Sequence, residues 1–188
     1  MAQKTDCIAI TRSTPEKEVL ELGSQCSQCG HCCRYGSGFV LKHEIKAMAD
    51  LKGISEKKFR NEYLKEVRMF DTLMLRFRKI QQENRPYGRC VFLDKENRCS
   101  IQEAKPLHCR IGNCSEHSQE LSIWFMLNHA VDETNPNSIR EWGIYLKTHP
   151  TIPGGNLEEL VPDKEQLKKM MDDHHTKEVD KDGRDKRS

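Results

Sequence analysis

The chain has 188 residues, a length typical of a single domain, so two independent catalytic domains are not expected. Hydrophobic residues make up 36% and charged residues 32%, which is polar for a globular protein, so we expect something besides apolar burial to support the fold. The 31 basic and 29 acidic residues leave a net charge of +2, which argues against a general nucleic-acid binder.

The N-terminal residues 1–23 are interpreted as a flanking segment, in which Cys7 is a free surface thiol. They contain neither a sustained apolar run nor a small-residue cleavage site, so no secretory signal is predicted. The longest apolar-rich run, residues 121–131, is too short to cross a bilayer, and no membrane partner is expected. We therefore expect a cytoplasmic protein, where closely spaced cysteines favour metal binding or redox chemistry over disulfides.

Four of the nine cysteines lie within the eight residues CSQCGHCC, at Cys26, Cys29, Cys32 and Cys33. Gly30 allows the backbone of this tight loop to bend around a bound ion. Because thiolates packed together repel one another without a cation, the spacing predicts a metal site. The alternative is that small cysteine side chains only fill space, but the polar neighbours do not resemble a core.

Between the two groups of cysteines, the pattern predicts two helices followed by a strand. Apolar residues recur at helical spacing over residues 41–51 and again over residues 59–70. Residues 72–80 alternate instead, which is typical of a half-buried strand. In this strand one face would carry Leu73, Leu75 and Phe77, and the other Arg76 and Arg78.

A second group of cysteines comprises Cys90, Cys99, Cys109 and Cys114. Residues 90–94 and 98–101 flank a polar turn and predict a short hairpin that carries the first two. Nearby positive charge could offset the negative charge of four thiolates around a divalent ion or an oxidised 4Fe-4S core. The basic residues that adjoin the cysteines are Arg34, Arg89, Arg98, Lys105 and Arg110, although each could equally be a solvated surface charge.

Residues 115–171 are expected to form a helical extension packed on the same domain. Residues 121–130 are apolar nearly all round and predict a buried helix, with Trp124 and Phe125 in the core. The spacing of Ser138 and Glu141 is that of a capping box at the start of the next helix.

The C-terminal part is predicted to contain one more helix and a tail. Asp163 can cap a short helix that ends at Met171. Residues 172–188 are charged and poor in apolar side chains, so we expect a disordered tail.

The spacing of the cysteines narrows the choice of metal. C-x2-C-x2-C with a distant fourth cysteine is closer to a ferredoxin spacing than to the paired knuckles of structural zinc, so a 4Fe-4S cluster is favoured and zinc is the second choice. His31 and His108 are alternative ligands, although neighbouring histidines more often only donate hydrogen bonds. The sequence contains no common nucleotide-binding or hydrolase motif, so an enzyme would have to use the metal centre itself.

Three segments, CSQCGHCC at 26–33, CVFLDKENRCSI at 90–101 and KPLHCR at 105–110, resemble the YkgJ-type cysteine-cluster family, whose CxxCxxCC domain is described as zinc- or iron-chelating. The resemblance covers residues 24–114, which we take as a cysteine-cluster metal-binding domain. It implies a small metal or iron–sulfur protein with eight cysteine ligands. Cys114 completes the eight. The seven that match the family by motif are Cys26, Cys29, Cys32, Cys33, Cys90, Cys99 and Cys109.

Together these observations predict an α+β protein, a mostly helical small domain with a short β-hairpin, organised around a cysteine-rich metal centre. The expected role is redox chemistry or electron transfer with a protein partner. Two alternatives stay open at this point. One is a structural zinc module that serves as an adaptor, and the other is an enzyme or accessory of protein side-chain modification, suggested by a flagellin lysine methylase that carries a related cluster.

Overall fold

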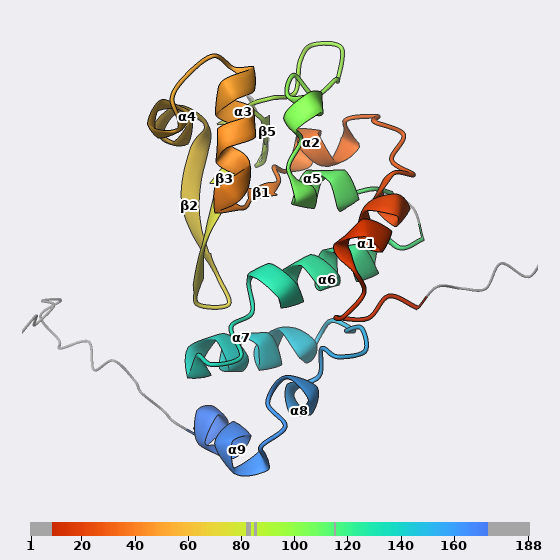
Figure 1. Cartoon of the computed structure of the whole chain (residues 1–188), viewed down its shortest axis with the longest axis vertical. Helices are drawn as coiled ribbons and strands as arrows, with labels where there is room; N and C mark the ends of the chain where they lie inside the picture. Colours follow the sequence, from red (N-terminus) through yellow and green to blue (C-terminus); the bar gives the residue numbers. More distant parts are fainter. Residues whose placement is uncertain (1–8, 82–83, 85, 115, 173–188) are drawn as a thin grey trace, which may run out of the picture.

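The computed structural model describes residues 9–81, 84, 86–114 and 116–172. Cys7 and the charged tail beyond residue 172 lie outside the described residues. Figure 1 shows an elongated molecule in which the strands, α2 and α5 occupy one end and the C-terminal helices the other. The helices are α1 (Glu16–Gly23), α2 (His31–Tyr35), α3 (Ile45–Leu51), α4 (Glu56–Tyr63), α5 (Leu107–Ile111), α6 (Ser118–His129), α7 (Pro136–Leu146), α8 (Leu157–Leu160) and α9 (Lys164–Asp172), with 3-10 turns at Lys42–Glu44 and Gln102–Ala104.

The strands form two small antiparallel sheets, so the α+β class is confirmed. One sheet has the order β1-β3-β2 and the other pairs β4 with β5. The hairpin of β2 and β3 runs from the pair Leu64–Phe77 to the pair Met69–Thr72. The strands are β1 (Phe39–Val40), β2 (Leu64–Met69), β3 (Thr72–Phe77), β4 (Lys79–Gln81) and β5 (Gly88–Cys90).

The helix predicted over residues 59–70 is wrong in its second half. The helix ends at Tyr63, and Val67 lies in β2, where it pairs with Met74. Phe70 and Asp71 form the two-residue turn to β3 with φ angles of 48° and 53°, as the turns favoured by β-hairpins require. Pairing with the next strand therefore overrides a helical pattern of apolar residues, since tertiary context outweighs local propensity.

The three-stranded sheet β1-β3-β2 separates two hydrophobic cores. Met74 belongs to the core that lies under α1, α5, α6 and α7, whereas Leu75 and Phe77 belong to the core that lies under α3 and α4. The strand was expected to be half-buried with Leu73 inside, but Leu73 is 56% exposed and Met74 is buried in its place. Both faces of β3 are thus covered, because a core lies on each side of the sheet.

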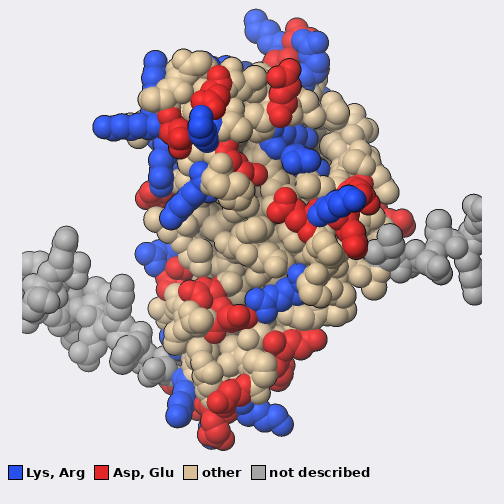
Figure 2. Space-filling model, viewed as in Figure 1, with Lys and Arg blue, Asp and Glu red and all other residues tan. Residues whose placement is uncertain are grey.

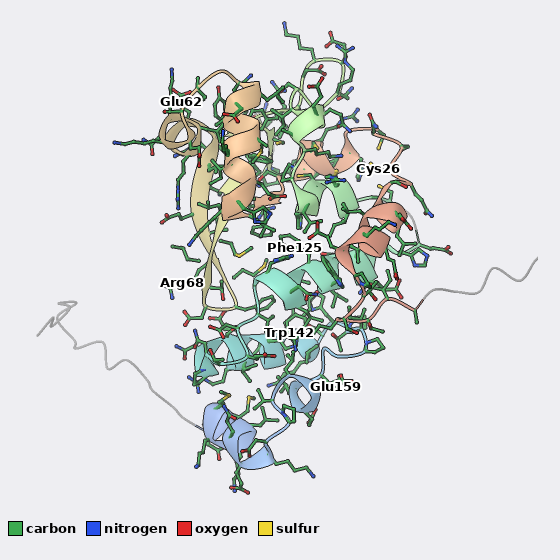
Figure 3. All side chains as sticks on the ribbon, viewed as in Figure 1. Cys26, Glu62, Arg68, Phe125, Trp142 and Glu159 are labelled. Carbon is green, nitrogen blue, oxygen red and sulfur yellow. The ribbon has the colours of Figure 1, made fainter. Side chains whose placement is uncertain are left out.

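The first core confirms the predicted buried helix. Trp124 and Phe125 of α6 are buried, and Trp142 of α7 is fully buried, with its indole N–H donating to the carbonyl of Gly155 at 2.8 Å. In Figure 3, Phe125 and Trp142 lie on neighbouring helices below the end of the molecule that holds Cys26.

The caps of α7 and α9 were predicted with different success. Asn135, not Ser138, caps α7: its side-chain oxygen accepts from the backbone N–H of Asn137 at 2.9 Å. Ser138 lies inside the helix, and its hydroxyl accepts from the N–H of Asp132 at 2.9 Å. The predicted cap of α9 is confirmed, because Asp163 accepts from the N–H groups of the two residues that follow Lys164.

The segment 90–101 is a compact loop with one antiparallel bridge, between Leu93 and Cys99. Two backbone hydrogen bonds flank this bridge, from Asp94 N to Arg98 O and from Ser100 N to Phe92 O, both 2.9 Å long, so the two predicted arms do pair around the bridge. Cys90, however, ends β5, which pairs with β4. In the part of the chain that the structure describes, no helix combines the length and apolarity needed to span a membrane. On the face drawn in Figure 2, basic and acidic side chains lie among one another.

Candidate metal centre

The first group of cysteines lies on the loop between α1 and α2 and on α2 itself. Gly30 precedes α2 with a φ angle of 71°, a conformation that favours glycine. A Cβ at this position would come within 2.8 Å of the carbonyl oxygen of Asn97, so the loop lies directly against the segment 90–101. Arg34 strengthens this contact, since its Nε donates to the side-chain oxygen of Asn97 at 3.0 Å.

The second group is carried by three different elements. Cys90 ends β5, Cys99 forms the bridge to Leu93, and Cys109 lies on α5. Cys114 follows α5 by three positions and is exposed. Helix α5 is held in place by α1, because Gly23 packs so closely that a Cβ there would lie 2.7 Å from the carbonyl oxygen of Arg110.

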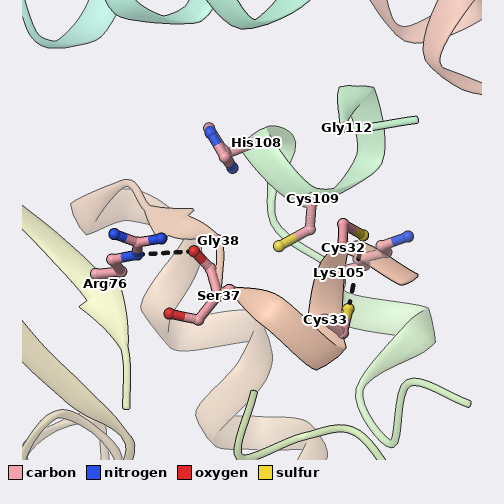
Figure 4. A pocket seen from close by; sticks show the side chains of 10 residues that line it. Cys32, Cys33, Ser37, Gly38, Arg76, Lys105, His108, Cys109 and Gly112 are labelled. Atoms are coloured by element: carbon pink, nitrogen blue, oxygen red, sulfur yellow. Dashed lines mark hydrogen bonds between the residues drawn. The ribbon is translucent and has the colours of Figure 1, made fainter. Parts of the chain in front are cut away.

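Three cysteines from these distant segments, Cys32, Cys33 and Cys109, lie around the pocket shown in Figure 4. A cavity of about 200 Å³ is lined by Cys32 and Cys33 of α2, Cys109 of α5, and two basic residues, Arg76 and Lys105. The sulfurs of Cys32 and Cys33 are 3.9 Å apart. One cavity is therefore lined by two thiols of the first cysteine group and one of the second.

Burial divides the eight thiols. Cys90 is buried, and Cys33, Cys99 and Cys109 are half-buried and pack against the same hydrophobic core as Phe92. The remaining cysteines lie nearer the surface: Cys26 is half-buried, and Cys29, Cys32 and Cys114 are exposed.

Three of the thiols accept a hydrogen bond from the backbone two residues further along. The backbone of His31 bonds to Cys29, that of Phe92 to Cys90, and that of Ile101 to Cys99. Each of these bonds favours the thiolate over the thiol, and hydrogen bonds to sulfur are among the factors that tune metal–thiolate centres. This donor set suits a metal that prefers sulfur ligands.

Burial opposes ionisation of the inner thiols. It raises the pKa of Cys90 to about 11 and also raises the pKa of Cys99 and of Cys109. The hydrogen bond between Cys32 and Cys33 raises the pKa of Cys33 and lowers the pKa of Cys32 to about 6. Buried thiols of this kind ionise readily only when a cation compensates the charge, which links metal binding to proton release.

Two cations face the thiols. Lys105 lines the cavity and acts electrostatically on Cys32, Cys99 and Cys109. Arg76 of β3 is half-buried, its Nε donates to the carbonyl of Ser37 at 2.8 Å, and its charge acts on Cys90 and Cys109.

Sequence reasoning assigned Arg76 to the outer face of its strand and missed its approach to the thiols. The other predicted basic neighbours have different contacts: Arg89 donates to the carbonyl of Leu93, and Arg98 pairs with Asp94 and Glu96. Arg110 is exposed. The alternation of residues 72–80 could not reveal Arg76, because only pairing with β1 brings β3 beside Ser37.

Gly38 is a second site residue without a signal in the sequence. A Cβ built on Gly38 would come within 2.0 Å of the sulfur of Cys109 and 3.5 Å of the imidazole Nδ1 of His108. The missing side chain makes the space that the Cys109 thiol occupies. The structure thus provides a cradle for a sulfur ligand at this position.

The two candidate histidine ligands differ in their surroundings. His108 packs edge-on against Phe125 and Phe39, with ring centroids 4.6 and 5.1 Å away. Burial lowers the pKa of His108 to about 4, so the ring is neutral at physiological pH. His31 is exposed and packs on Tyr35 with ring centroids 4.9 Å apart.

Within the described residues, no three Cys, His, Asp or Glu side chains are arranged so that they could hold a metal ion. The eight thiols form no disulfide with one another. The donor set nevertheless fits a thiolate-bound metal, because sulfur, hydrogen-bond donors and compensating cations gather at one end of the fold.

A comparison with protein-family models places residues 25–131 in the CxxCxxCC model, described as a "putative zinc- or iron-chelating domain". The matched segment begins at the loop before Cys26 and continues through α6. Comparisons with curated proteins and with solved structures found no match.

Proposed function

Since the chain belongs to the CxxCxxCC family, which is described as chelating zinc or iron, we propose that it is a metal-binding protein whose ligands are eight cysteines. The proposed ligands are Cys26, Cys29, Cys32, Cys33, Cys90, Cys99, Cys109 and Cys114.

The observation that carries the proposal is the convergence of thiols from separate segments beside two cations. Cys33 of α2 and Cys109 of α5 line one cavity with Arg76 and Lys105, although the segments are more than 70 residues apart in the chain. Thiolate ligands must lose their protons, and positive side chains favour the resulting negative charge. Metal binding would also add to a fold whose composition is polar, because free energy of binding becomes free energy of folding.

The spacing of the first three cysteines favours an iron–sulfur centre over zinc, as argued above. A bound 4Fe-4S cluster supplies a one-electron couple whose potential depends on nearby charge and on hydrogen bonds to sulfur. Here those hydrogen bonds come from the backbone after Cys29, Cys90 and Cys99. The exposed thiols of Cys29 and Cys32 give a protein partner access to this end of the molecule. We propose electron transfer or redox sensing in the cytoplasm, where closely spaced thiols stay reduced.

Purification without exposure to air, followed by metal, acid-labile sulfide and visible absorption measurements, tests the proposal. We expect iron and sulfide in equal amounts and a charge-transfer absorption that bleaches on reduction. Zinc without sulfide would overturn the iron–sulfur assignment and favour a zinc adaptor, while leaving metal binding intact. Protein that holds no metal after reconstitution with either would overturn the proposed function itself.

A pair of matched variants sharpens this test. Cys29→Ser removes one exposed proposed ligand, and we expect it to lose metal. Cys7→Ser removes the one cysteine outside the proposed set, and we expect it to keep the metal content of the wild type. Equal metal content in the two variants would remove Cys29 from the ligands.

A further inference from the structure

We propose that the eight cysteines form two four-thiolate centres that interleave in the sequence, an inner set and an outer set. This inference rests on the proposed function and concerns how the ligands are divided. The division differs from the order of the chain, in which the four cysteines of 26–33 would form one site and the four of 90–114 the other. The inner set is Cys33, Cys90, Cys99 and Cys109, and the outer set is Cys26, Cys29, Cys32 and Cys114.

The inner set is defined by a shared hydrophobic environment. Cys90 is part of the core that contains Phe92, and the other three members pack against that core. Electrostatic interactions link Cys33 with Cys90 and Cys109, and link Cys109 with Cys90 and Cys99. Cys32 also acts on Cys90, Cys99 and Cys109, so the shared core, and not the electrostatic coupling, distinguishes the inner set. A centre held by these thiols would be shielded from solvent on the side of the core.

The outer set is defined by exposure and by the position of Cys114. Cys29, Cys32 and Cys114 are exposed, and Cys26 is half-buried. Cys114 shares a hydrogen bond with Cys29 and interacts electrostatically with Cys26 and Cys32. Cys114 therefore lies with the first loop, even though it is the last cysteine of the chain.

The adjacent residues Cys32 and Cys33 separate the two sets. Successive side chains on a helix point about 100° apart, so neighbours on α2 cannot face the same direction. Cys32 is exposed, whereas Cys33 packs against the core, and their sulfurs are 3.9 Å apart. The pair consequently supplies one ligand to each centre and brings the two centres close together.

The cations are distributed unevenly between the sets. Arg76 is half-buried and acts on Cys90 and Cys109, both members of the inner set. Lys105 lines the cavity beside Cys33 and Cys109 but also acts on Cys32. Positive side chains of the protein thus compensate the negative charge of the inner thiolates, whereas the outer thiolates are in addition stabilised by solvent.

Chemical mapping on the wild-type chain tests the division without any substitution. The metal-loaded protein is treated briefly with a chelator under argon, alkylated with iodoacetamide, and analysed by fragmentation mass spectrometry of its peptides. We expect alkylation of the four outer cysteines while the four inner ones stay protected. Alkylation of Cys33 together with Cys26, Cys29 and Cys32, with Cys114 protected, would overturn the division, as would equal labelling of all eight.

Double variants give a second test with the opposite outcomes for the two groupings. Under the proposed division, C29S/C114S and C33S/C109S each lose half of the bound metal, whereas C29S/C33S loses all of it. If the ligands followed the order of the chain, C29S/C33S would keep half, and the other two pairs would lose all.

These outcomes separate the division from the proposed function. A wild-type chain without metal refutes both, whereas loss of all metal in every variant refutes only the two centres. Circular dichroism identifies a variant that fails to fold. In that case two results test the division: the metal content of C29S/C114S, which alters only exposed thiols, and the mapping experiment on the wild-type chain.

Discussion

Gly38, which immediately precedes β1, lies in direct contact with Cys109 of α5 because glycine has no side chain. The Cys109 sulfur lies 2.0 Å from where a Cβ on Gly38 would be, which is far inside van der Waals contact. The carbonyl of Gly38 also accepts from the N–H of Phe77 at 3.1 Å, so its backbone is held by the sheet. The thiol, rather than the strand, would have to move if this glycine were replaced.

We expect Gly38→Ala to displace the Cys109 thiol and to remove metal, with a loss of about 1–3 kcal/mol in unfolding free energy from overpacking. Gly36→Ala is the matched control, because a Cβ there would lie 3.4 Å from the nearest atom, the carbonyl oxygen of Cys32. Metal content and chemical denaturation of both variants are the measurements. Equal metal loss in the two would contradict the role of the contact.

Arg76→Met should weaken metal binding, because it removes a half-buried positive charge that acts on Cys90 and Cys109 while retaining most of the apolar stem. We expect a loss of about 1–2 kcal/mol in the binding free energy, which is the interaction of two unit charges about 10 Å apart at an effective dielectric constant of about 20. Competition with a chelator measures this change, and redox titration should show a more negative potential if the metal is an iron–sulfur cluster.

Arg78→Met is the control for that substitution. Arg78 follows two positions later, is exposed, and donates to the carbonyl of Asn61 at 3.2 Å. We expect it to leave metal affinity unchanged. Arg76→Lys should restore part of the affinity, since it keeps the charge but not the planar group that donates to Ser37.

Asn135→Ala should destabilise the fold by about 1 kcal/mol, because it removes the cap of α7 and leaves an N–H of the first turn unpaired. Asn135→Ser, which retains a capping oxygen, should recover most of that loss. Urea denaturation of the three proteins checks the prediction. A serine variant as unstable as the alanine variant would show that the bond from Asn135 to Asp71, and not the cap, is what matters.

Stability should fall as the pH drops below about 6.5, in part because of His129. Burial lowers the pKa of His129 in the fold, where it packs against Trp124 and Phe125, and its Nε2 has no hydrogen-bond partner. The unfolded chain therefore takes up the proton at higher pH than the fold does. Glu16 opposes and His43 reinforces this effect.

The contribution of His129 is complete above the ordinary pKa of histidine and is lost as the pH falls toward the lower pKa of the fold. Urea midpoints at pH 7.5 and 5.5 should therefore differ less in His129→Gln than in the wild type. An identical pH dependence in the two proteins would assign the effect to other groups, of which His108 is one because burial lowers its pKa as well.

The correct predictions from sequence depended on local physics. The buried helix around Trp124 and the cap at Asp163 follow from residues near one another in the chain, and both are present. The helix over residues 59–70 failed, because its second half pairs with a strand that the helical pattern cannot reveal. Capping of α7 by Asn135 was missed since Ser138 offered a competing local pattern.

The residues of the candidate site also differ in whether the sequence could reveal them. The thiols were identified from spacing, because several cysteines within eight residues are informative without any tertiary structure. Gly38 and Arg76 were not, since their roles depend on which strand passes beside α5. Which thiols lie near Cys114 is likewise a property of the fold, because residues 26–33 and 114 are joined by no motif.

The close packing of α1 on α5 sets a practical limit on shortening the molecule. A chain that starts at Ser24 would keep every cysteine of the family motif but would lose the helix against which Arg110 and Ile111 rest. A shortened chain, or a graft of the cysteine-bearing segment into another scaffold, should therefore include residues 16–23.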